Sequence, residues 1–103
     1  MNRAALALIA ALAACATTDP PQSQIASAHE MVARARAAAE QDAPPELATA
    51  QGKLDRADRA MQRRHYEHAR LLAEQAEADA RLAWVTSEKA RAERALESER
   101  VSR

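Results

Sequence analysis

Residues 66–84 read YEHARLLAEQAEADARLAW, a stretch without proline or glycine in which alanine recurs every three or four residues. This spacing places the recurring residues on one face of an α-helix. They are Tyr66, Ala69, Ala73, Ala76, Ala80 and Ala83. Alanine is the strongest helix former, but its methyl group buries little apolar area. The stretch therefore predicts a helix that packs closely against its neighbours through small side chains.

Prolines divide the rest of the chain. They occur as two pairs, Pro20-Pro21 and Pro44-Pro45. Apolar residues step by three and four on either side of the second pair, which is typical of helices in a heptad pattern. The two sets are Ile25, Ala28, Val32, Ala35 and Ala39, then Leu47, Ala50, Leu54, Ala57 and Met61. We expect a first helix capped by Ser23 or by Ser27 with Glu30, and a second that starts at Pro45.

Residues 62–65 interrupt the small apolar pattern, and we interpret them as a tight helix–helix turn. They contain neither glycine nor proline, so one continuous helix is an alternative. The last segment runs to about residue 100 and would span roughly 50 Å, nearly twice the second helix. The sequence predicts an all-α fold, either an antiparallel helical hairpin or a three-helix bundle, with a long alanine-rich C-terminal helix. Part of that helix must overhang unless the first helix or another chain covers it.

The N-terminus has the pattern of a bacterial lipoprotein signal peptide. Arg3 is followed by an uncharged apolar run at 4–14, which is too short to cross a bilayer. Leu12, Ala13 and Ala14 precede Cys15, as in a lipobox, where small residues fit the peptidase and the thiol receives diacylglycerol. A plain secretory signal is the alternative.

These features predict three parts: a signal peptide at 1–14, a lipidated Cys15 with a tether at 15–22, and a helical domain at 23–103. Two or three acyl chains on Cys15 would hold the protein on the membrane, whereas one chain anchors only marginally. Ala16, rather than aspartate, after the cysteine resembles the outer-membrane sorting signal of Gram-negative bacteria. We expect a lipid-anchored protein of the bacterial outer membrane that faces the periplasm.

Residues 45–92 resemble a bacterial family known as domain of unknown function 4398. The resemblance rests on three segments, which are PELA at 45–48, KLDRA at 53–57 and YEHARLLAEQAEADA at 66–80. It implies a helical hairpin with a tight turn and a return helix rich in alanine. It also implies a small periplasmic lipoprotein.

The charged residues give little sign of a chemical site. The chain has 15 basic and 15 acidic residues, and this balance argues against nucleic-acid binding. His65 and His68 flank Glu67 at helical spacing, but no third metal ligand is evident. We interpret Arg63, Arg64 and His65 as a solvated turn, and contact with anionic lipid headgroups or wall polymers is the alternative. No nucleophile motif or phosphate loop is present, so we expect no enzyme activity, cofactor, metal or small-molecule substrate.

Two non-enzymatic functions fit the pattern. The first is a structural or scaffolding lipoprotein that associates with itself or with an envelope protein, because large apolar side chains are too few for a thick core. The second is an adaptor that binds another envelope protein through a second apolar stripe of the last helix, around Trp84, Val85 and Leu96. Trp84 lies where the second helix should end, so it either packs over the bundle or contacts a partner.

Overall fold

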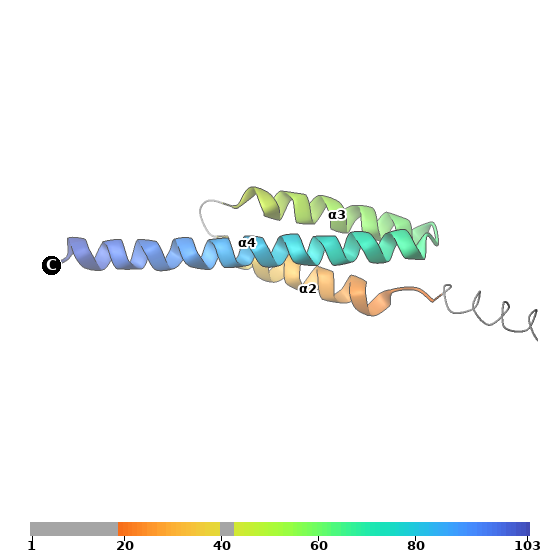
Figure 1. The fold of residues 1–103 in the computed structure, drawn as a ribbon, viewed down its shortest axis with the longest axis horizontal. Helices are drawn as coiled ribbons and strands as arrows, with labels where there is room; N and C mark the ends of the chain where they lie inside the picture. Colours follow the sequence, from red (N-terminus) through yellow and green to blue (C-terminus); the bar gives the residue numbers. More distant parts are fainter. Residues whose placement is uncertain (1–18, 40–42) are drawn as a thin grey trace, which may run out of the picture.

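The computed structural model describes residues 19–39 and 43–103. These residues contain three helices and no strand: α2 (Gln22–Ala38), α3 (Pro45–Gln62) and α4 (Tyr66–Val101). The helices run up, down and up, and both α2 and α3 pack along the first half of α4 (Figure 1). The all-α fold with a long last helix is therefore confirmed. Of the two predicted architectures, the described residues form the three-helix bundle.

Proline marks the start of two helices. Pro44 has the extended backbone of a helix N-cap, and Pro45 occupies the first position of α3 as predicted. The helix α2 begins at Gln22, directly after Pro21, whose carbonyl oxygen accepts a hydrogen bond from the Ile25 amide at 3.0 Å. The predicted Ser23 cap is wrong, because Ser23 lies inside the helix and its hydroxyl contacts Gln24 Oε1. The alternative cap at Ser27 is wrong for the same reason.

The turn between α3 and α4 is real, and it forms without glycine. Arg64 adopts the left-handed region with φ of 61°. Its amide donates to the Met61 carbonyl at 3.0 Å, and the His65 amide donates to the Ala60 carbonyl at 2.8 Å. These two bonds make a Schellman motif, which ends a helix and reverses the chain. The turn therefore places an arginine where glycine is the usual residue.

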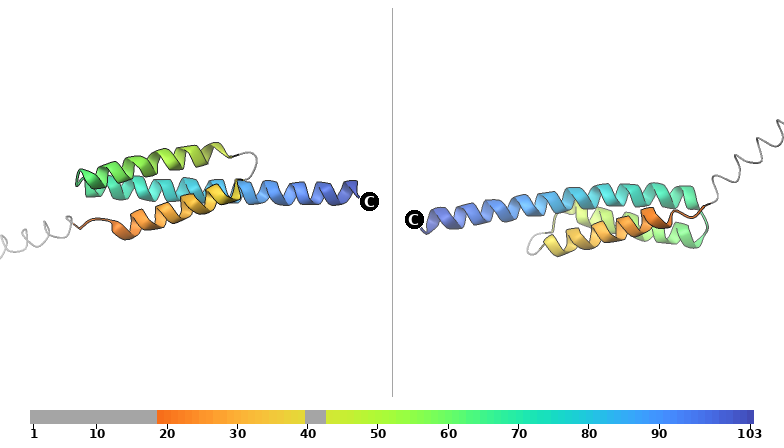
Figure 2. Two further views of the ribbon diagram at one scale, coloured as in Figure 1. Left: turned by 180° about the vertical axis from the view of Figure 1, so that it is seen from behind. Right: turned by 90° about the horizontal axis from the view of Figure 1, so that it is seen from below.

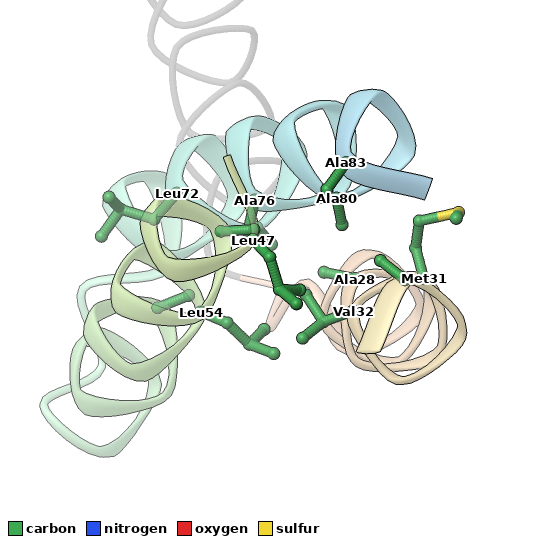
Figure 3. Packing of buried hydrophobic residues seen from close by; sticks show 13 residues of the cluster. Ala28, Met31, Val32, Leu47, Leu54, Leu72, Ala76, Ala80 and Ala83 are labelled. Carbon is green, nitrogen blue, oxygen red and sulfur yellow. The ribbon is translucent and has the colours of Figure 1, made fainter. Parts of the chain in front are cut away.

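The core is made largely of small side chains, and many of them lie on one face of α4. We call Ala69, Ala73, Ala76, Ala80 and Ala83 the alanine stripe; each is fully buried. Leu47, Leu54 and Val32 supply larger side chains from α3 and α2. Figure 3 shows Leu47 and Val32 meeting between the helices, with Ala76 and Ala80 facing them. The stripe on α4 is thus the surface that both other helices share.

The predicted apolar positions of the two shorter helices are mostly correct. In α3, Leu47, Ala50, Leu54 and Ala57 are buried, but the fifth buried residue is Ala60, and Met61 is only partly buried. In α2, Met31 is buried in addition to the predicted residues, and Ile25 packs at the edge of the core.

Polar contacts fix how the helices are aligned. Lys53 Nζ lies 2.7 Å from Asp79 Oδ2 and joins α3 to α4. His29 and Asp58 join α2 to α3 at 3.0 Å. Further along the same two helices, Gln51 of α3 lies opposite Arg36 of α2. When the Gln51 amide is oriented with its oxygen toward α2, that oxygen accepts hydrogen bonds from the Arg36 guanidinium at 2.8 and 3.0 Å. The start of α2 therefore lies at the same end of the bundle as the α3–α4 turn, as both figures of the ribbon show (Figures 1 and 2).

The C-terminal part of α4 extends past the other helices. With 36 residues against 18 in α3, α4 is about 54 Å long and α3 about 27 Å. The last residue of α4 that is buried is Ser87, and residues 91–103 are all exposed. We call residues 88–101 the overhang. The predicted overhang is present in the described chain, because α2 covers no more of α4 than α3 does (Figure 1).

Candidate interaction surfaces

An apolar stripe runs along the exposed side of α4. Its large side chains are half or more exposed: Leu71 by 51%, Leu82 by 52%, Val85 by 50% and Leu96 by 64%. Val101 at the end of the helix is 78% exposed. Two of these residues, Val85 and Leu96, are predicted partner contacts, and the structure leaves both open to solvent. The overhang therefore presents apolar groups that nothing in the described chain covers.

Trp84 does not share this exposure. It is partly buried and packs against the hydrophobic core near the end of the bundle. Of the two roles that the sequence leaves open for Trp84, packing over the bundle is the one that the structure shows. The exposed contact surface is thus carried by Val85 and Leu96.

Charges on the overhang are mixed and largely paired within the helix. Arg91 lies 3.4 Å from Glu88, Arg100 lies 3.5 Å from Glu97, and Lys89 lies 4.0 Å from Glu93. Exposed pairs of this kind stabilise a helix by only a few tenths of a kcal/mol, roughly 0.2–0.5 each. Acidic and basic side chains are thus balanced on the overhang, which carries no large excess of positive or negative charge.

A second surface lies at the opposite end, where α3 meets α4. A cleft of about 260 Å³ is lined by Ala60 and five basic residues. These are Arg56, Arg59, Arg63, His65 and His68. We call this the basic cleft. Arg56 and Arg59 lie in α3 and Arg63 is the C-cap residue that follows it, so the three arginines continue one helical spacing. The two histidines come from the interhelix turn and the first turn of α4.

The sequence interpretation identifies only part of the basic cleft. It singles out the basic run that contains Arg63 and His65, but it does not connect Arg56, Arg59 and His68 with that run. The spacing of Arg56, Arg59 and Arg63 on one helix face is a signal that the sequence does contain. Their closeness to His68 depends on the antiparallel packing of α3 on α4.

The side chains that commonly bind metal ions are scattered in the described part of the chain. Across residues 19–39 and 43–103, no three side chains of His, Cys, Asp or Glu come together as a metal site. His65 and His68 share the basic cleft with arginines, which repel a cation.

The predicted lipidation site lies outside the described residues. This applies to Cys15 and to the lipobox residues Leu12, Ala13 and Ala14, as well as to the whole signal peptide at 1–14. Among the helices that the structure does describe, none is long and apolar enough to cross a membrane.

Comparison with known proteins identifies the family of the chain. The family model described as domain of unknown function (DUF4398) matches residues 23–98. The chain belongs to the DUF4398 family. The matched region covers α2, α3 and most of α4, so this DUF4398 domain is the whole bundle and not only the hairpin of 45–92. No curated protein and no solved structure matches the chain.

Trp84 and Val85 are neighbours in sequence with different surroundings, which gives a matched test. Trp84→Ala should lower the free energy of unfolding by about 1–3 kcal/mol, because it removes a partly buried ring from the end of the core. Val85→Ala should change it by less than about 0.5 kcal/mol. Urea unfolding followed by circular dichroism measures both. Equal losses would show that Trp84 does not support the bundle.

Proposed function

We propose that this DUF4398 protein is a lipid-anchored structural protein of the bacterial outer membrane that faces the periplasm. Acyl chains on Cys15 hold it on the membrane, and the overhang of α4 associates with a second copy of the chain. The protein is a non-enzymatic scaffold. The observation that carries this proposal is the overhang itself, the end of a long helix that has no other helix beside it within the described residues (Figure 1).

The anchor is supported by the sequence. Cys15 is the one cysteine of the chain, and it follows an uncharged apolar run and the three lipobox residues. Cleavage before it would make it the first residue of the mature protein. The few residues between Cys15 and Gln22 then serve as the tether between lipid and bundle.

Association is supported by the exposed apolar groups of α4. Val85, Leu96 and Val101 are each exposed by half or more. Burying such side chains removes apolar area from water, at about 25 cal/mol per Å². A helix whose apolar groups continue beyond its own bundle is a ready surface for another helix.

A second copy is the occupant that the charge pattern favours. The overhang alternates Glu88, Lys89, Arg91, Glu93 and Arg94 over two turns. Two such helices placed side by side can match acid with base. A partner with a strong excess of one sign would instead be repelled by the overhang residues that carry the same sign. An adaptor that grips a different envelope protein through the same stripe is the competing outcome of the test.

The anchor is tested by labelling cells with radioactive palmitate. The wild-type protein should take up label and sediment with the outer membrane. Cys15→Ser should lose both, while the control Thr17→Ser, which leaves the lipobox and cysteine intact, should keep both. A wild-type protein without label, together with a Cys15→Ser protein that reaches the same membrane fraction, would contradict the anchor.

Association is tested by thermal unfolding of residues 16–103 over a hundredfold range of concentration. If two copies associate, the melting temperature should rise by about 5–10 °C from the lowest to the highest concentration. Val85→Gln with Leu96→Gln should remove this dependence. The control Leu71→Gln makes the same change on α4 far from the overhang and should retain it.

A melting temperature that does not depend on concentration would contradict self-association. Crosslinking from position 96 in cells then decides between the two partners. Crosslinks between two copies support the scaffold, and crosslinks only to a different envelope protein assign the overhang to an adaptor.

A further inference from the structure

The basic cleft contains positive charge without a matching acid. Within the described residues, no carboxylate lines it and none forms an ion pair with Arg56, Arg59 or Arg63. Three acids are sequence neighbours of cleft residues. Asp58 bonds to His29, Glu67 lies 3.9 Å from Arg70, and Asp55, which precedes Arg56, does not line the cleft. The cleft is therefore suited to an anion that is not part of this region of the chain.

Positive charge is concentrated at this end of the bundle. Residues 56–70 contain five arginines against Asp58 and Glu67, although the whole chain is balanced. The first backbone amides of α4 also lie here, and a helix N-terminus carries a partial positive charge. An anion at this end meets an attractive field from both sources.

The turn beside the cleft has an unusual residue for its shape. Arg64 takes the left-handed conformation that glycine adopts without cost, whereas a residue with a Cβ atom is strained there. Its long side chain is exposed. The strained position of the turn is therefore occupied by a cation, which adds to the positive charge at this end.

The tether brings this same end to the membrane. Gln22 starts α2 at the same end of the bundle as the α3–α4 turn (Figure 2), and six residues, 16–21, lie between it and Cys15. The seven residue-to-residue steps from Cys15 to Gln22 reach at most about 25 Å when fully extended. An anchor at Cys15 therefore keeps the turn end within about 25 Å of the lipid surface. The end of the overhang, which lies at the other end of a helix about 54 Å long, has no such restraint.

We propose that the basic cleft binds the phosphate groups of anionic lipid headgroups in the membrane that holds the anchor. This inference rests on the lipid anchor of the proposed function, because the anchor sets which surface the cleft meets. Arginine forms paired hydrogen bonds with phosphate oxygens, and three arginines on one helix face provide several such donors. Each further basic group near an anionic surface adds to the attraction. Binding here fixes the orientation of the bundle on the membrane.

The test is native mass spectrometry of the full mature protein in detergent micelles. Phosphatidylglycerol or phosphatidylcholine is added at the same molar ratio, and the retained lipid is measured for each. The mass of the chain itself reports whether Cys15 is acylated, so the anchor and the cleft are read separately in one experiment. Wild-type protein should retain at least fivefold more of the anionic lipid than of the zwitterionic one.

Two variants of equal charge change locate the binding. Arg59→Gln with Arg63→Gln should lower the retained phosphatidylglycerol at least fivefold. Arg94→Gln with Arg103→Gln, which removes two exposed arginines from the far end of α4, should retain it as wild type does. Circular dichroism checks that both variants keep the helical content and melting temperature of the wild type.

Three results would overturn the proposal. They are equal retention of the two lipids, undiminished retention by the Arg59 and Arg63 variant, and full displacement of the lipid by soluble glycerol phosphate at the same concentration. The last result would assign the cleft to a free phosphate compound. A chain without acyl mass that still retains phosphatidylglycerol through Arg59 and Arg63 supports the cleft and contradicts the anchor.

Discussion

The fold depends on close contact along the alanine stripe of α4. Each of its alanines is fully buried, and both α2 and α3 pack against it. Small side chains let helix axes approach toward the short end of the usual range of about 8–10 Å. At that distance the few larger residues, such as Leu47, Leu54 and Val32, can fill the centre of the bundle. A chain with so few large apolar side chains has no other way to exclude water from its core.

This constraint also divides α4 into two parts with different properties. The part up to Ser87 is held on two sides, and the part beyond it has no helix beside it in the described chain. The two ends of the molecule differ in charge as well, because the turn end is basic and the overhang is mixed. In the proposed arrangement the basic end faces the lipid and the overhang reaches into the periplasm, where a second copy meets it.

Much of the fold could be predicted from the sequence because local signals agree with the packing. The proline pair places the start of α3, and the recurring alanines identify the buried face of α4. Ala60 is buried in place of the predicted Met61 for a simple reason. A helix has 3.6 residues per turn, so a pattern that alternates steps of three and four drifts away from the buried face towards the end of the helix. The predicted serine cap failed because Pro21 already supplies a helix start that needs no side-chain bond.

Other features depend on contacts that a linear pattern does not contain. The choice between hairpin and bundle required the position of α2, whose own apolar face is narrow. The turn at Arg64 lacks the glycine that normally identifies a Schellman motif, so its geometry was not evident. The basic cleft exists only because α3 returns along α4 and brings Arg59 close to His68. The role of Trp84 likewise followed from where α3 begins.

The most direct test of the central claim compares two alanines on opposite sides of α4. Ala76 is fully buried in the stripe, and Ala78, two residues further, is exposed. Ala76→Leu should lower the free energy of unfolding by about 1–3 kcal/mol, because added methylene groups force the helices apart. Ala78→Leu should leave it within about 0.5 kcal/mol of wild type. If urea unfolding shows that Ala76→Leu is as stable as Ala78→Leu, the close contact along the stripe does not hold the bundle together.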